Sequence, residues 1–127
     1  MAVQPTRPGF HTITPNIVVR GAADAIEFYK KAFGAVELQR SHVPDTSIVM
    51  HAELQIGDSI LFVNDEFPDM EAMSPLHYNG TSMTLMLAVD DVDQWFARAV
   101  AAGCTVDMPI ADMFWGDRFA SVSDPFG

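Results

Sequence analysis

The chain has 127 residues, of which 49% are hydrophobic, and its 17 acidic and 7 basic side chains give a formal net charge of −10. This is the size of one ordinary domain with a real apolar core, which excludes a disordered chain and two large domains. The negative charge disfavours nucleic acid and anionic membranes as partners; it favours cationic ligands, although acidic surfaces usually serve only solubility.

The first half of the chain predicts one helix among several strands. Residues 1–11 form an irregular arm with Pro5, Pro8 and Gly9, and they lack the apolar core of a signal peptide. Residues 13–19 predict an edge or early strand, because Pro15 cannot donate a backbone hydrogen bond. Residues 24–34 repeat apolar side chains at helical period, between an expected N-cap at Asp24 and a stop at Gly34. Residues 35–43 and 47–57 predict strands, and Gly57-Asp58 predicts a hairpin into the next strand.

Residues 65–80 show neither helical nor strand periodicity and predict a loop or linker. They hold two prolines, four acids and a closing Asn-Gly pair. Their apolar side chains, Phe67, Met70, Met73 and Tyr78, offer a contact surface for a homodimer or fold back over the chain's own core.

The second half resumes the pattern with a strand at 82–89, a helix at 91–103, a strand at 104–110 and a strand-like segment at 113–123. The single cysteine, Cys104, excludes a disulfide framework within one chain. Its place at the start of an apolar strand predicts a buried small hydrophobe, which fits a reduced cytoplasmic setting. The final Asp-Pro-Phe-Gly at 124–127 predicts a turn.

The second half repeats the first. Val19 corresponds to Val89, Gly34 to Gly103 and Val36 to Val106, at a spacing of 69 to 70 residues. A duplicated unit of this kind cannot bury its sheet face alone, so we expect the two copies to pack as a pair.

The stretch MHAELQ at 50–55 carries the best candidate for chemistry. Strand alternation places His51 and Glu53 on one face with Gln55, and the apolar side chains of Met50, Ala52, Leu54 and Ile56 on the other. If the apolar face packs on a helix, the pair lines a cleft and can act as acid and base. The alternatives are a solvated polar face and, less favoured, a divalent metal at His51.

Phe114 and Trp115, before Gly116, are two large aromatic side chains at a bend. Such rings can stack on planar or cationic ligands in a cleft, or cap the core at a sheet edge, or form a dimer contact. Asp117 and Arg118 beside them predict a local ion pair or a polar anchor for a ligand.

Four stretches together resemble the vicinal oxygen chelate superfamily, in particular its PhnB-like branch. They are AIEFYKKAFGA, MHAELQIGDSILFVNDEFP, VDDVDQWFARAVAAG and FWGDRFASVSDPFG. The superfamily contains glyoxalases, extradiol dioxygenases and bleomycin or fosfomycin resistance proteins. The resemblance implies an α+β fold of tandem βαβββ modules around a half-open cleft. It implies one domain over 1–127, with module one at about 11–64, the linker at 65–80 and module two at about 81–127.

The resemblance also locates the metal-ligand positions that many relatives use. They fall on Thr14 and Thr84 on the first strands, which are 70 residues apart, and on or near Phe62. The fourth position belongs to an eighth strand that we expect to be missing after residue 127. Threonine is a poor ligand for a catalytic divalent ion and phenylalanine cannot coordinate one, so no cofactor is predicted. Instead, Thr14, Phe62, Thr84, Phe114 and Trp115 are candidates for lining a ligand site.

Three functions remain open. The first is a lyase or isomerase that uses His51 and Glu53 on an unknown small molecule. The second is a non-catalytic protein that sequesters a ligand or drug, and the third is an orphan domain with a vestigial cleft. No glycine-rich phosphate loop or nucleophile elbow indicates another chemistry.

Overall fold

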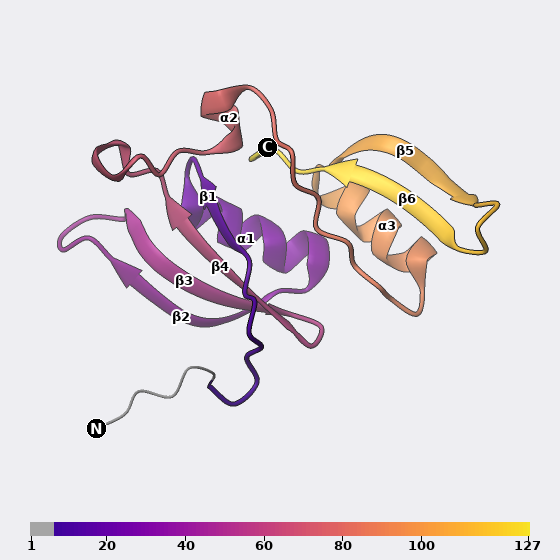
Figure 1. Cartoon of the computed structure of the whole chain (residues 1–127), viewed down its shortest axis with the longest axis horizontal. Coiled ribbons are helices and arrows are strands. Elements are labelled where there is room, and N and C mark those ends of the chain that lie inside the picture. The colour runs from indigo at the N-terminus through magenta and orange to yellow at the C-terminus, as the bar shows by residue number, and fades with distance from the viewer. Residues whose placement is uncertain (1–6) are drawn as a thin grey trace.

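The computed structural model describes residues 7–127, so the first six residues of the N-terminal arm lie outside the described part (Figure 1). The chain is an α+β fold that lacks the strand expected at 82–89 and has the following elements. They are β1 (Asn16–Val19), α1 (Ala22–Phe33), β2 (Val36–His42), β3 (Val49–Ile56), β4 (Ser59–Asp65), the 3-10 helix η1 (Pro68–Met70), α2 (Pro75–Tyr78), α3 (Val92–Ala102), β5 (Thr105–Asp112) and β6 (Arg118–Ser123).

Module one is a four-stranded sheet in the order β1-β4-β3-β2, covered on one face by α1. β1 runs parallel to β4, and the other neighbouring pairs are antiparallel. Ile26 of α1 packs with Leu54 and Val63 of the sheet, all of them fully buried. Burying these branched apolar side chains stabilises the module by roughly 2 kcal/mol each.

Helix α1 begins two residues earlier than its expected N-cap, Asp24. The N-cap is Gly21, whose left-handed φ of 83° lets the chain turn sharply from β1 into the helix. Glycine has no side chain to cap the helix, and Asp65 at the end of β4 does so instead. Its carboxylate accepts hydrogen bonds from the backbone N–H of Gly21 and Ala22, at 3.1 and 2.8 Å.

The two faces of β3 separate as predicted except at Met50. Ala52 and Leu54 lie in the core under α1, whereas His51 and Glu53 lie on the other face. Met50 is exposed and Val49 is buried in its place. The reason is a register shift against β2, in which His42 pairs with Val49 and Ser41 with His51, so that Met50 is the bulged residue.

Segment 65–80 connects the modules and contains η1 and α2. Glu66 holds it in place, because its carboxylate accepts hydrogen bonds from the Ser74 hydroxyl at 2.6 Å and the Ser74 N–H at 3.1 Å. In residues 7–127, no helix has the length and apolar character needed to cross a membrane.

Module two contains α3 and the β5–β6 hairpin, but the strand expected at 82–89 does not form. Its apolar side chains, including Met83, Leu85 and Met86, are exposed. In module one the corresponding strand, β1, takes its hydrogen bonds from the fourth strand. The described part of module two has only β5 and β6 in its sheet, so segment 82–89 has no strand to pair with.

The strands of the two modules form separate sheets, and the modules meet through their helices. From α3, the Arg98 guanidinium donates to the carbonyl oxygens of Lys31 and Lys30 at 2.7 and 3.1 Å, which satisfies the C-terminal end of α1. Phe126 of the terminal turn packs edge-on against Phe28 of α1, with ring centroids 5.8 Å apart. The terminal turn thus packs back onto module one.

Candidate functional site

The face of the module-one sheet opposite α1 carries the ionisable pair. The strand register places Gln39 of β2, Glu53 of β3 and Phe62 of β4 side by side in one row. His51 lies two residues along β3, on the same face. Antiparallel neighbours in register have side chains within contact distance, so Phe62 forms one wall beside Glu53.

Glu53 is the centre of this site. Its residue surface is only 5% exposed, and its Oε2 atom lies 2.9 Å from Nε2 of His51. The same oxygen accepts a hydrogen bond of 2.8 Å from the Arg7 guanidinium, which reaches over from the N-terminal arm. The carboxylate is therefore buried but paired, as a stable buried charge must be.

The surroundings of Glu53 keep it ionised. Burial alone would raise the pKa of its carboxyl, but the hydrogen bonds from Arg7 and His51, together with their charges, outweigh burial and leave that pKa below its usual value. Glu53 is therefore ionised at neutral pH, and its charge is paired with that of Arg7.

Aromatic rings border this charge. The His51 ring meets the Phe62 ring edge-on with centroids 4.7 Å apart, and Phe10 lies 6.1 Å from Phe62. The guanidinium carbon of Arg7 lies 3.9 Å from the centroid of the Phe10 ring, within cation–π distance. A carboxylate bordered by aromatic faces attracts flat organic cations.

The side chains at the metal-ligand positions that the resemblance implies do not fit a divalent cation. Thr14 is half-buried just before β1, Thr84 lies exposed in segment 82–89, and Phe62 offers only a ring. Between Arg7 and Gly127, no three His, Cys, Asp or Glu side chains gather as a metal-holding group. His51 and Glu53 supply two donors, and the Arg7 guanidinium already contacts the latter.

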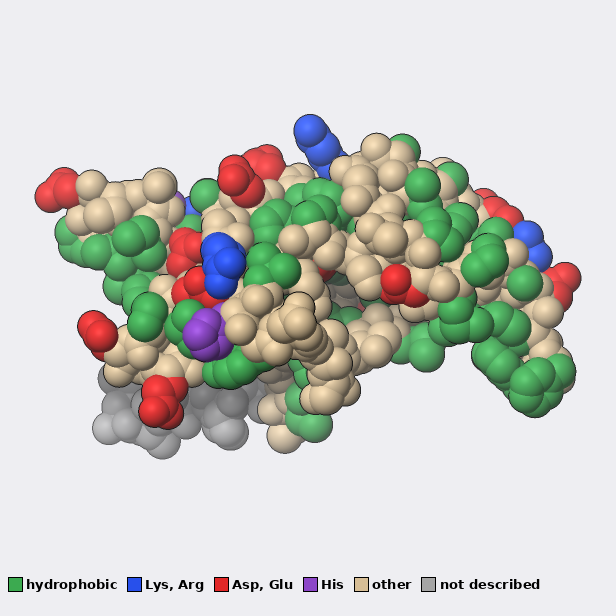
Figure 2. Space-filling model, turned by 90° about the horizontal axis from the view of Figure 1, so that it is seen from above, with side chains coloured by type: hydrophobic (Ala, Val, Ile, Leu, Met, Phe, Trp, Pro, Cys, Tyr) green, Lys and Arg blue, Asp and Glu red, His purple; other side chains and the backbone are tan. Residues whose placement is uncertain are grey.

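Phe114 and Trp115 lie away from this face, in the turn between β5 and β6 of module two. Phe114 is 98% exposed, and its ring meets Trp115 edge-on at 5.0 Å. Figure 2 shows hydrophobic side chains gathered at this hairpin end of the molecule. The structure therefore does not bring these two aromatics together with His51 and Glu53.

The ion pair expected between Asp117 and Arg118 is replaced by another. Arg118 donates to both carboxylate oxygens of Asp93 on α3 at 2.8 Å each, and to Asp112 of β5 at 3.0 Å. These contacts tie the hairpin to α3, which is a structural role. Cys104 is buried, as predicted, and burial followed by the nearby Asp124 raises the pKa of its thiol to about 11.

Arg7 and Phe10 are not among the predicted site residues, because residues 1–11 are predicted only as an irregular arm. The available signal was the stretch Arg7-Pro8-Gly9-Phe10. Proline and then glycine at the centre of four residues predict a tight turn that brings its ends together. The turn forms: Gly9 has a φ of 84°, and the Phe10 N–H donates to the Arg7 carbonyl at 2.9 Å.

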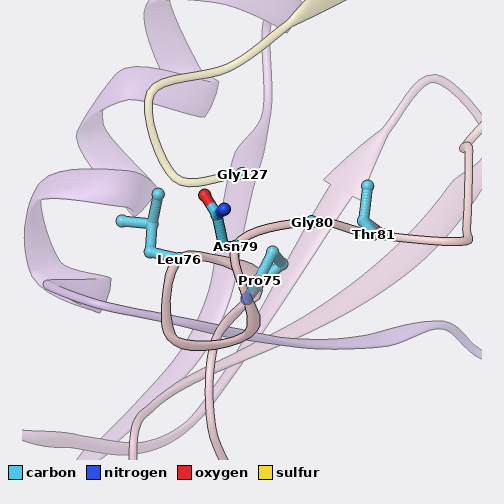
Figure 3. Close-up of a pocket in the computed structure, with 6 residues that line it drawn as sticks. All are labelled: Pro75, Leu76, Asn79, Gly80, Thr81 and Gly127. Carbon is cyan, nitrogen blue, oxygen red and sulfur yellow. The ribbon is translucent and has the colours of Figure 1, made fainter.

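A hollow of about 270 Å³ lies away from this face, beside α2. Pro75, Leu76, Asn79, Gly80, Thr81 and Gly127 line it (Figure 3). The Asn79 side chain points towards the loop that ends at Gly127. None of the lining side chains is ionisable, so this hollow is a weaker candidate for chemistry than the face around Glu53.

Comparison with known proteins agrees with this architecture. The family model described as the glyoxalase/bleomycin resistance protein/dioxygenase superfamily matches residues 9–127. An uncharacterised protein of Mycobacterium tuberculosis is 46% identical over 118 residues, which cover 91% of this chain and 69% of that protein. Among solved structures, a gene product of Arabidopsis thaliana is 30% identical with a TM-score of 0.72, over 93% of each chain. TioX from Micromonospora sp. ML1 is 25% identical with a TM-score of 0.65, over 91% of this chain and 90% of TioX. The chain therefore belongs to the glyoxalase/bleomycin resistance protein/dioxygenase superfamily.

Proposed function

We propose that this chain is a non-catalytic binding protein that holds a small molecule on the face of the module-one sheet opposite α1, with Glu53 as its anchor. The observation that carries the proposal is the carboxylate of Glu53, which is 5% exposed and kept ionised by its partners, beside the ring of Phe62. A buried fixed charge next to an apolar wall orients a ligand.

Binding is favoured over acid–base catalysis by the same observation. A general acid or base is most effective when its pKa lies near the working pH. The pKa of Glu53 is shifted down, away from neutrality. It is therefore a poor proton donor at neutral pH but a good partner for a cation.

A lyase or isomerase remains the second candidate, and a specific contact favours it. Glu53 lies 2.9 Å from Nε2 of His51, and a carboxylate that orients an imidazole in this way can support it as a base. In this alternative His51 moves the proton while Glu53 only positions it. No metal takes part in either proposal.

The test is a fragment screen of aromatic amines, aromatic acids and neutral aromatics by backbone amide NMR. We expect bound fragments to shift the amides of His51, Glu53 and Phe62. The Glu53→Gln variant should lose these shifts, whereas Glu37→Gln should keep them, because Glu37 pairs with Lys30 and Arg40 elsewhere on the module. Shifts confined to the Asn79 hollow, or none, would overturn the proposal. Conversion of a bound fragment that stops in His51→Gln would establish the catalytic alternative.

A cytoplasmic location belongs to the same proposal, because a free, buried Cys104 suits a reducing compartment. No further partner class is proposed beyond a small molecule and a second copy of the chain.

A further inference from the structure

We propose that the face around Glu53 is a recognition site for a guanidinium or amidinium group, and that Arg7 occupies it until such a ligand displaces it. This names the ligand class of the binding function proposed above and rests on that function.

The Arg7 guanidinium shows which chemistry the site accepts. It donates to Oε2 of Glu53 at 2.8 Å while it lies 3.9 Å from the centroid of the Phe10 ring. Carboxylate on one side and an aromatic face on the other are the two contacts that a planar, delocalised cation makes best. A compact ammonium ion makes the first contact but stacks less well.

The two partners in this contact differ in burial, and this difference makes displacement possible. The side chain of Glu53 is 7% exposed, whereas that of Arg7 is 52% exposed. Glu53 is fixed by its strand between β2 and β4, while Arg7 sits on an arm that precedes β1. Arg7 therefore loses little burial when it moves into water, but the buried carboxylate left behind is costly unless another cation pairs with it.

The present contact uses one of the two carboxylate oxygens of Glu53. Within residues 7–127, the hydrogen bonds from Arg7 and His51 both use Oε2 of Glu53. Oε1 is therefore the atom to which a second N–H of an incoming guanidinium would donate. A two-pronged pair of this kind is stronger and more directional than the single bond that Arg7 makes.

The Arg7–Phe10 turn pre-assembles the cation and its aromatic support. Pro8 and Gly9 close the turn, with Gly9 at a φ of 84°, and the Phe10 N–H donates to the Arg7 carbonyl at 2.9 Å. The Phe10 ring packs beside the Phe62 ring, with centroids 6.1 Å apart, and this contact attaches the turn to the sheet. When Arg7 leaves, the Phe10 ring stays as a platform for the ligand.

An internal competitor lowers the apparent affinity for an external ligand by the fraction of time that the site is closed. If Arg7 closes the site nine-tenths of the time, its removal raises the apparent affinity about tenfold.

The experiment titrates phenylguanidine, with phenylurea as its uncharged isostere, into the full chain and follows amide shifts and heat of binding. The wild type is compared with Arg7→Gln and with Arg20→Gln, a matched control whose arginine pairs with Glu66 instead. We expect phenylguanidine to bind Arg7→Gln about tenfold more tightly than the wild type or Arg20→Gln. Phenylurea should bind all three weakly, and Glu53→Gln combined with Arg7→Gln should abolish phenylguanidine binding.

A further variant tests the Phe10 ring separately from Arg7. Phe10→Leu keeps Arg7 and the apolar contact with Phe62 but removes the ring beneath the guanidinium. It should weaken the hold of Arg7 and also remove half of the ligand's support, so its phenylguanidine affinity should fall below that of Arg7→Gln. Equal affinities would contradict the role assigned to Phe10. Thermal unfolding of each variant confirms that the fold persists.

Two results would overturn the inference. If Arg7→Gln binds phenylguanidine no more tightly than the wild type, Arg7 is not a competitor. If phenylurea binds as tightly as phenylguanidine, the site does not select the cation. In both cases, fragments that still shift the amides of Glu53 and Phe62 keep the binding function intact. If no probe shifts those amides even in Arg7→Gln, the proposed function itself fails.

Discussion

The Tyr29 hydroxyl donates a hydrogen bond of 2.7 Å to the Asp124 carboxylate, across 95 residues of the chain. It joins α1 of module one to the terminal turn of module two. Together with the packing of Phe126 on Phe28, it fixes the end of the chain against the first module. The contact is partly buried, so its loss should be measurable as stability.

Tyr29→Phe removes this hydrogen bond and keeps the ring. Because the acceptor is a charged group, we expect a loss of about 2 kcal/mol in the free energy of unfolding, measured by urea denaturation. Tyr78→Phe, at an exposed tyrosine of α2, is the control and should change stability by less than about 0.5 kcal/mol. Equal effects of the two substitutions would contradict a role for the hydroxyl.

The same pair predicts a weakness at alkaline pH. Burial first, and then Asp124, raises the pKa of the Tyr29 hydroxyl above its ordinary value of 10.0. The unfolded chain therefore releases this proton near pH 10.0 while the folded chain keeps it. The stabilisation from the Tyr29–Asp124 hydrogen bond is complete below that pH and falls above it. The free energy of unfolding of the wild type should therefore approach that of Tyr29→Phe as the pH rises. A constant difference between the two proteins from pH 8 to 11 would refute this linkage.

Gly34 ends α1 at a left-handed φ of 67°, and a Cβ there would lie 3.1 Å from a guanidinium nitrogen of Arg98. Gly34→Ala should destabilise the chain by about 1 to 2 kcal/mol through backbone strain. Gly80→Ala is the matched control, because Gly80 has open space around it and no positive φ. Calorimetric melting of both variants is the measurement. A Gly34→Ala protein as stable as Gly80→Ala would disprove the strain.

Glu66 predicts how the connecting segment responds to acid. Hydrogen bonds from the Ser74 side chain, then from Arg20 and from the Ser74 backbone, lower the pKa of Glu66 to about 2. Because this pKa is lowered, the stabilisation that the Glu66 carboxylate gives segment 65–80 is complete above pH 4.5. It is lost as the pH falls towards about 2. The NMR shift of the Ser74 N–H should titrate with a midpoint near the lower value and should not titrate in Glu66→Gln. A midpoint near 4.5 would show that Ser74 and Arg20 do not stabilise the ionised Glu66 carboxylate.

A homodimer stays a prediction. On the segment thought to supply the contact, Met70 and Tyr78 are exposed, whereas Phe67 and Met73 are half-buried against the chain itself. Sedimentation should show a dimer at micromolar concentration that weakens in Met70→Ser/Tyr78→Ser. Phe114→Ser, at the tip of the β5–β6 hairpin, is the comparison. A monomeric wild type would remove the prediction.

Features that depend on near neighbours in the chain could be predicted from the amino-acid pattern. Helical periodicity placed α1 and α3, and strand alternation placed His51 and Glu53 on one face of β3, because each pattern repeats within a few residues. The internal repeat indicated the tandem modules, and the four distinctive stretches indicated the superfamily that the comparisons confirm.

Features that depend on a distant partner follow only from the three-dimensional fold. Segment 82–89 has the composition of a strand, yet strand structure needs a neighbouring backbone, and that partner is absent from the described part of module two. The sequence makes Phe114 and Trp115 candidates for contacting a ligand, but both lie exposed in the turn between β5 and β6. Arg7 contacts Glu53, 46 residues away in the sequence, because the Pro8-Gly9 turn packs on the module-one sheet. A local sequence pattern predicts the turn but not the surface on which it packs.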